Sequence, residues 1–583
     1  MNRSTRLFRF AGACMSMFAP AIVLADVPPA LDRCPADAPI FISIKSVSAF
    51  KSSLNTMATT LKIPAEAMQG LKKADEVLKM PGLNVEGSAA VAVMGLEDSG
   101  SQPPIVMIIP IKDYAAFAKS LGGSGAGAEK VKFEDEDAYV KDLGGGFAAL
   151  SPTQDLVEKF EGKTGHGKDI EALMGPTGKA VSDSCDAFVL ANMQIVGPMM
   201  KEGMEDFKNQ MEMMGAMAGG GANKAGFDMI NAFMDGFVRD ASAGVMGFKA
   251  TDAGLKVDVG AQFKPESAFA GYLSTKGKTG SLIGALPNQA FLFAMSMDTS
   301  SPGFKQIAKN IVETSKKDPE AAQAMSGLNP LESIEKVDGI AFCMGQTPAL
   351  MGGLFLNTSM FVKTSDPAGY CKQVKDGFGT MNGKTVQGIA YQTKYEVGGG
   401  KVGEKAVDAW SMKMTADKDN PQGAQIAQAQ MMMFGPGGLG GFLAPTDGGV
   451  VMTYGKNSDL MGKALEAAKS NTGLTGDAGF KAVAAQLPSD RSVEMYIGVK
   501  SIMETAIGFM GMMGAGPANF EVPADLPPIG MGGVAQGGGM RFSTFVPTQV
   551  LTTVKSLTDS MKGQDDAEPA EPAPKEKAGQ PKF

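Results

Sequence analysis

The 583-residue sequence has few of the residues on which most enzyme and nucleic-acid sites depend. It contains one histidine and one tryptophan, and aromatic residues make up 7% of the chain. Imidazole is the commonest general acid and base near neutral pH, so a single histidine excludes most imidazole-dependent chemistry. Acidic residues (62) outnumber basic residues (54), giving a formal net charge of −8. Nucleic-acid binding needs a basic face, and this balance argues against it.

The sequence also lacks any Cys-x-x-Cys pair, which argues against a thioredoxin-like redox motif or a zinc knuckle. Beyond the first 25 residues it has four cysteines, Cys34, Cys185, Cys343 and Cys371. In an oxidising compartment they permit two disulfides in three connectivities. We favour Cys34–Cys185, because both precede strand-like runs, and Cys343–Cys371, because the second lies on the helix expected to cover the strand of the first. Free, buried thiols are the alternative.

Residues 1–25 have the pattern of a signal peptide. Arg3, Arg6 and Arg9 form a positive start, and the apolar run Phe10–Leu24 is too short to span a bilayer. We expect cleavage after Ala25 and a mature protein that is periplasmic or secreted. A lipoprotein modified at Cys14 and an uncleaved anchor remain alternatives. No later stretch is long and apolar enough to cross a membrane, so contact with a membrane would be at its surface.

A short pattern recurs in which Leu or Cys, then Pro and a turn residue, precede an apolar strand. Its copies begin at Cys34, Leu286 and Leu487. Strand-then-helix segments at 108–117 and 361–370, and glycine-led strands at 145–150 and 448–453, recur in the same order. We therefore predict two related halves, 26–280 and 281–562, the second with a Gly/Met-rich insertion near 415–445. The acidic, Pro/Ala-rich tail 563–583 should be disordered.

These repeat openings resemble those of an exported bacterial domain family of unknown function, whose repeats begin with Leu-Pro-Ala-Asp. The resemblance covers roughly residues 30–560. The sequence departs from it at Cys34, where leucine is expected, and at Asn288 and Ser489, where alanine is expected. The resemblance implies an exported protein with a repeated strand-and-helix unit, and it implies no catalytic residue or cofactor.

Alternating strands predict the fold class. Leu255, Val257 and Val259 alternate with Lys256 and Asp258, and residues 389–395 alternate in the same way. Such strands have one solvent-exposed face, which is typical of antiparallel sheets. We predict an α+β fold of two tandem halves, each a mainly antiparallel sheet covered by amphipathic helices.

Methionine is unusually frequent, with 42 in the chain. Met200, Met204, Phe207, Met211 and Met214 recur at helical spacing and predict an apolar helix face. Thioethers are soft ligands for Cu(I), but methionine also occurs in strands throughout the chain and no histidine accompanies the clusters. Flexible apolar packing explains this distribution better than a metal site. We predict no metal site and no cofactor.

The sequence predicts an exported, non-enzymatic protein with a binding or structural role in the cell envelope. Its partner would be an envelope protein or a hydrophobic ligand. The alternative is binding to a membrane surface or a hydrophobic ligand through the Met-rich amphipathic helices. An enzyme that uses unrecognised carboxylates is a third hypothesis, which converging Asp or Glu side chains in a deep pocket would support.

Overall fold

The computed structural model describes residues 27–61, 63, 75–96, 103–133, 136–200, 235–317, 330–347, 353–386, 389–416, 428, 430–431, 433–435, 438–512 and 520–565. In these residues the chain forms helices and one large antiparallel sheet, which confirms the α+β class. Residues 1–25, to which we assigned the signal peptide, lie outside the described residues.

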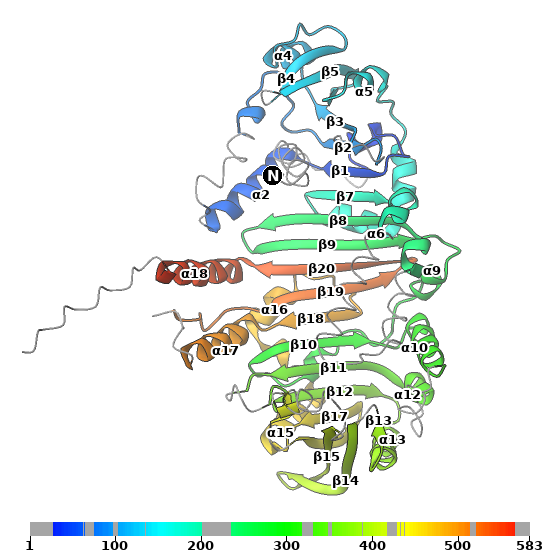
Figure 1. The fold of residues 1–583 in the computed structure, drawn as a ribbon, viewed down its shortest axis with the longest axis vertical. Coiled ribbons are helices and arrows are strands. Elements are labelled where there is room, and N and C mark those ends of the chain that lie inside the picture. Colours follow the sequence, from blue (N-terminus) through cyan, green and yellow to red (C-terminus); the bar gives the residue numbers. More distant parts are fainter. Residues whose placement is uncertain are drawn as a thin grey trace, which may run out of the picture.

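The sheet has 20 strands, and each described pair of neighbours is antiparallel. Figure 1 shows the strands side by side along the long axis of the molecule, most of them roughly perpendicular to it. From one edge to the middle the order is β4 (Glu129–Phe133), β5 (Glu136–Gly144), β6 (Phe147–Ser151), β3 (Ile105–Pro110), β2 (Ala89–Val93), β1 (Ile40–Ile44), β7 (Ala187–Asn192), β8 (Ala241–Thr251) and β9 (Gly254–Phe263).

The second half of the sheet begins beside β9, with the last strand of the chain. The order continues with β20 (Gly539–Pro547), β19 (Ile529–Gln536), β18 (Val493–Ile497), β10 (Phe291–Asp298), β11 (Val337–Gly345), β12 (Thr358–Thr364), β17 (Gly449–Tyr454), β16 (Leu439–Thr446), β15 (Lys405–Ala416), β14 (Ile389–Val402) and β13 (Thr385–Val386). The early and late parts of the chain therefore meet along a single seam, the β9–β20 pair.

Helices pack against the sheet and its strand ends. They are α2 (Val47–Thr60), α4 (Tyr114–Ser120), α5 (Gln154–Lys159), α6 (Gly167–Ser184), α9 (Ala268–Tyr272), α10 (Pro302–Ser315), α12 (Pro330–Lys336), α13 (Pro367–Met381), α15 (Ser458–Ser470), α16 (Ala478–Ala484), α17 (Val499–Met512) and α18 (Thr548–Asp565), with 3-10 turns η1 (Leu31–Arg33), η2 (Ile283–Ala285) and η3 (Leu474–Gly476). In the middle of the sheet, α6 packs on β7, β8, β9 and β20, and α16 packs on β19. We call the side of these central strands that carries α6 and α16 the helix face, and the opposite side the open face.

The two strand-then-helix segments compared in the sequence both fold as predicted. Asp113 accepts a hydrogen bond from the amide of Ala116 at the start of α4, at 3.1 Å. Asp366 accepts one from the amide of Gly369 at the start of α13, at 2.8 Å. Each aspartate satisfies an amide that has no partner inside its helix, which fixes where the helix begins.

The alternation in β9 was read correctly as a strand, but its faces were assigned the wrong way round. Asp258 is fully buried and Gln262 is buried, whereas Val259 is 43% exposed. The polar side chains point to the helix face, where α6 provides partners: the hydroxyl of Ser184 donates to Asp258, and the amide of Thr177 donates to Gln262 at 3.3 Å. Buried polar groups with such partners are tolerated, so polarity alone did not mark the solvent side.

Two described elements overlap segments whose boundaries we predicted from the sequence. The predicted insertion near 415–445 overlaps β16, which pairs with both β15 and β17 and belongs to the sheet. The predicted tail from residue 563 overlaps α18, which continues to Asp565, because Gly563 does not end the helix.

Candidate functional site

Three exposed apolar side chains lie next to one another across the middle of the open face. The strand register pairs Met246 with Val259, and Val259 with Phe542. Their exposed fractions are 40%, 43% and 47%. Directly opposed residues in an antiparallel pair share one face of the sheet, so the three form a row across β8, β9 and β20.

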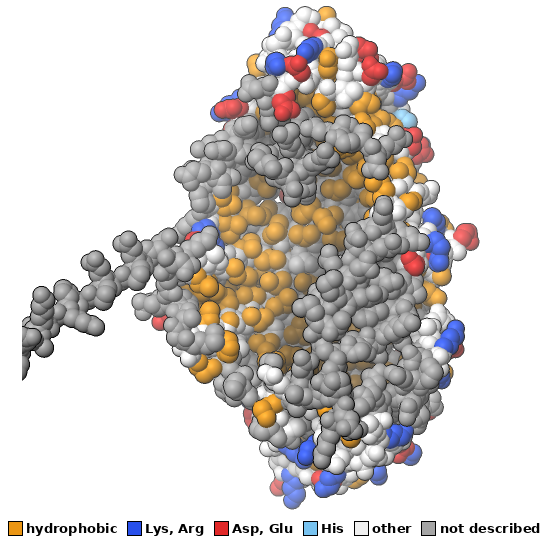
Figure 2. Space-filling model, viewed as in Figure 1, with side chains coloured by type: hydrophobic (Ala, Val, Ile, Leu, Met, Phe, Trp, Pro, Cys, Tyr) orange, Lys and Arg blue, Asp and Glu red, His pale blue; other side chains and the backbone are white. Residues whose placement is uncertain are grey.

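The row continues into a wider surface, which we call the apolar floor. Its other members are half-buried and lie on the same face of seven neighbouring strands, in the spatial order β7, β8, β9, β20, β19, β18 and β10. The strand register joins them to the row or to one another. The floor consists of Val189, Met246, Phe248, Val257, Val259, Met295, Val493, Met495, Met531 and Phe542. Figure 2 shows hydrophobic side chains gathered over these central strands.

The floor carries no charge. In β8, β9, β20, β19 and β18, all of which are described, no position on the open face is Asp, Glu, Lys or Arg. The polar exceptions on this face are Ser242 and Thr544. Soluble proteins rarely leave a contiguous apolar surface uncovered, and such surfaces mark places where something apolar binds.

Four hydrophobic clusters border the floor. One contains Phe50 of α2, and a second contains Met503 of α17 with Val550 of α18. A third contains Phe269 of α9, and a fourth contains Trp410 with partly buried residues of α13. Figure 1 places α2, α17 and α18 along one end of the strands and α9 and α10 along the other. Figure 2 shows a hollow over these central strands, so the floor is the base of a depression.

Most of the predicted Met-rich helix face lies outside the described residues. Met200 is described, is helical like residues 193–199 before it, and is 39% exposed. Met204, Phe207, Met211 and Met214 are not among the described residues. Exposed apolar residues also occur on the helix α17, where Phe509 and Met512 are 45% and 64% exposed.

Each of the four cysteines is a free thiol in the structure. Cys34 and Cys185 belong to one hydrophobic cluster, whereas Cys343 and the partly buried Cys371 belong to different ones. Burial raises the pKa of Cys343 to about 12 and that of Cys371 to about 11. Neither favoured disulfide is present in the structure, and both pairings stay predictions.

One carboxylate is buried among ionisable neighbours on the helix face. Glu494 is 1% exposed and accepts from the hydroxyls of Ser281, Ser296 (2.9 Å) and Tyr496 (2.9 Å), and from Nε of Arg491 (2.7 Å). Burial, together with the Glu494 charge, raises the pKa of Tyr496. All of these groups are engaged with one another, so the cluster is a structural network that joins β18 to β10.

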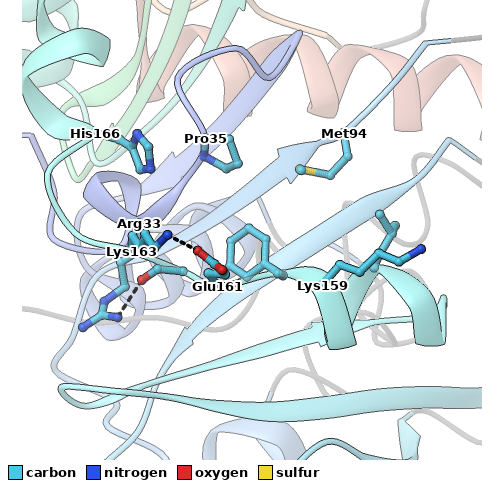
Figure 3. A pocket seen from close by; sticks show the side chains of 10 residues that line it. Arg33, Pro35, Met94, Lys159, Glu161, Lys163 and His166 are labelled. Atoms are coloured by element: carbon cyan, nitrogen blue, oxygen red, sulfur yellow. Dashed lines mark hydrogen bonds and ion pairs between the residues drawn. The ribbon is translucent and has the colours of Figure 1, made fainter.

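A concavity of about 290 Å³ lies beside η1 (Figure 3). The buried Arg33 contributes to its lining. Its Nη1 donates to the backbone oxygens of Leu143 at 3.3 Å and Gly162 at 3.0 Å, and its guanidinium lies 4.9 Å from the ring centre of Phe147. Arg33 therefore holds three chain segments together, which is a structural role.

The other cations of this concavity are also engaged. Lys159 pairs with Asp155 at 3.1 Å, and Lys163 pairs with Glu161. Figure 3 shows the Lys163–Glu161 pair, with His166 on the other side of the concavity. Because the lysines are exposed and already paired, the concavity offers no concentrated positive charge for an anion.

Within the described residues, no group of three or more His, Cys, Asp or Glu side chains is arranged to hold a metal ion. The same part of the chain contains no helix with the length and hydropathy needed to cross a bilayer. The apolar floor is thus the feature of the described structure most suited to a ligand.

Comparisons with known proteins add little. No family model matches the chain, and no curated protein matches it. One solved structure, described as crystal form III of TP0453, matches over 48% of this chain and 97% of its own, with 8% identity and a TM-score of 0.20. A similarity at that level carries no argument about fold or function.

Proposed function

We propose that this is an exported, non-enzymatic protein of the cell envelope that binds the acyl chains of lipids on its apolar floor. The observation that carries the proposal is the row of Met246, Val259 and Phe542, each at least 40% exposed, in the centre of an uncharged sheet face. Covering such a surface releases about 25 cal/mol for each Å² of apolar area, which is the main driving force available to this site.

The chemistry of the floor favours an acyl chain over a polar ligand. A polar ligand needs side-chain donors or acceptors, and the open-face positions of the five central strands offer only the hydroxyls of Ser242 and Thr544. Four floor residues are methionine, whose unbranched thioether adapts to chains of varied shape. The bordering helices also prevent a flat membrane or protein surface from contacting the floor, whereas a single extended acyl chain can lie on it.

We also propose that the two halves arose by duplication and that the chain is a distant member of the exported family with Leu-Pro-Ala-Asp repeats. Strand order supports the duplication. From one edge inward, the first half has the strand order β4-β5-β6-β3-β2-β1-β7-β8-β9. From β15 inward, the second half has the order β15-β16-β17-β12-β11-β10-β18-β19-β20. Each strand of the first half thus has a counterpart at the same place in the second half. In this correspondence the hairpin partner β14 and the short β13 are the additional elements of the second half.

Binding of cis-parinaric acid, a fluorescent fatty acid, tests the function. We expect saturable binding by the mature protein, and at least a tenfold loss of affinity in Val259→Asp, because a buried chain would leave the new carboxylate without water. Val397→Asp is the matched control, since Val397 is a strand valine, 69% exposed, far along the sheet in β14. Failure of the wild type to bind, or equal binding by Val259→Asp, would refute the proposal.

A second candidate is binding to a membrane surface, which the exposed side of α17 favours. Ile502, Phe509 and Met512 are 42%, 45% and 64% exposed and recur at helical spacing. Flotation with phosphatidylcholine vesicles tests it: the wild type should float, and a variant with all three residues changed to serine should not. If the wild type stays at the bottom of the gradient, this candidate is excluded.

A further inference from the structure

A cavity of about 160 Å³ opens beside the apolar floor. It lies between the ends of β18, β19 and β20 and the helices α9 and α10. Its lining includes Val493 and Phe542, which also belong to the floor, and Leu273, Phe304 and Ala535. The cavity is therefore continuous with the floor through shared side chains.

Two polar side chains of the cavity lining, Asp298 and Ser301, already have hydrogen-bond partners. Asp298 is buried and accepts from the backbone amides of Thr279 (2.9 Å), Gly280 (2.8 Å) and Ser300 (2.9 Å). Ser301 accepts from the amide at the start of α10, at 3.1 Å. Asp298 and Ser301 therefore need no hydrogen bond from a ligand, and both keep their partners when the occupant is apolar.

The volume limits what the occupant is. Whole small molecules occupy sites of about 300–1,000 Å³, so this cavity is too small for a complete ligand. An apolar cavity of about 150 Å³ accepts a body the size of benzene, with six carbons. We propose that the cavity receives the methyl end of a single unbranched acyl chain whose remaining length lies on the floor. This inference rests on the proposed function and adds to it a ligand class, straight-chain fatty acyl groups, and a device that measures their length.

Two substitutions change the cavity in opposite directions. Ala535→Phe adds a ring inside it, and Phe304→Ala removes one. We expect Ala535→Phe to weaken binding of palmitate at least tenfold while leaving decanoate within twofold of wild type. We expect Phe304→Ala to move the preferred chain length upward by two or more carbons. Ala406→Phe, which adds the same ring at an exposed position of β15, far along the sheet from the floor and the cavity, is the matched control and should retain the wild-type preference.

Displacement of cis-parinaric acid by saturated fatty acids from 8 to 20 carbons measures these preferences. If the wild type binds no fatty acid, the proposed function fails and the inference fails with it. If the wild type binds fatty acids but both cavity variants retain its chain-length profile, only the length-measuring cavity is overturned. A shift in opposite directions for the two variants supports the inference even if one of them is less stable.

Discussion

Asp258 and Val259 are consecutive residues of β9, and the carboxylate is fully buried while the valine is 43% exposed. Asp258 accepts a hydrogen bond from Ser184 at the end of α6 and lies 3.4 Å from Nζ of Lys256. Val259 faces the depression on the other side of the sheet. The usual distribution of polar and apolar side chains is thus reversed at the centre of the molecule. The polar side chains of the sheet are buried against α6, and the apolar side chains of its other face are exposed.

This reversal predicts unequal stability effects at the two positions. Asp258→Ala should destabilise the protein by about 1–3 kcal/mol, because it removes the hydrogen bond from Ser184 and leaves the mostly buried Lys256 without its carboxylate partner. Val259→Ser should cost about 0.5 kcal/mol or less, as expected for an exposed position. Urea denaturation followed by circular dichroism gives both values. Equal effects at the two positions would contradict the assignment of the faces.

The Glu494 network predicts a graded series. Tyr496→Phe removes one hydrogen bond to the carboxylate and should cost about 1 kcal/mol. Glu494→Leu should cost about 3–5 kcal/mol, because it leaves the partly buried Arg491 charge uncompensated. Both variants are compared by urea denaturation with Glu466→Leu, a substitution on α15 outside the network. A stable Glu494→Leu protein would show that the network contributes little.

The β4–β5 hairpin should respond to acid at an unusually low pH. Hydrogen bonds from Lys130, and then Lys132, lower the pKa of Asp137 from 3.8 to about 2. Since the folded pKa lies below the unfolded one, the stabilisation is complete above about pH 4 and is lost as the pH falls through about 2. Carboxyl chemical shifts in an NMR titration measure the midpoint. Changing both lysines to alanine should return it to near 3.8, and an unchanged midpoint would rule out the lysines as its cause.

The burial of the cysteines predicts their order of reaction. Cys371 is half-buried and should react with Ellman's reagent at pH 8 at least tenfold faster than the fully buried Cys343. The site of modification is identified by peptide mass spectrometry. In denaturant without reductant, a protein that begins at residue 26 should show four reactive thiols if the cysteines are free as in the structure. A count of zero would instead support two disulfides.

Local patterns in the sequence predicted individual helices and strands better than they predicted which elements pack against them. The strand-then-helix segments at 108–117 and 361–370 located two helices, and the structure shows that Asp113 and Asp366 cap them. Such local features depend on a few neighbouring residues. The faces of β9 could not be assigned in this way, since alternation is symmetrical and does not say which side a helix will cover. The pairing of β9 with β20 joins residues nearly 300 positions apart, and no local pattern encodes it.

One signal for the faces was present in the sequence. Gly247 and Gly260 occupy helix-face positions, and a Cβ at either would lie 2.5 Å from Cys185 Sγ or 2.7 Å from the Thr177 methyl group. Glycine in a strand interior often marks close approach of another element. Gly260 of β9 and Gly247 of β8 lie on the same side of the sheet as Asp258, and they indicate the side on which α6 packs. The opposite side is then the one left open to a ligand.

The β9–β20 seam has a consequence for biosynthesis. β20 begins at Gly539, so β9 has no neighbour on that side until residues 539–547 have been made. A bare ten-residue edge is a template for self-association. The N-terminal half should therefore be prone to self-association until β20 pairs with β9, and chains shortened before Gly539 should accumulate as aggregates.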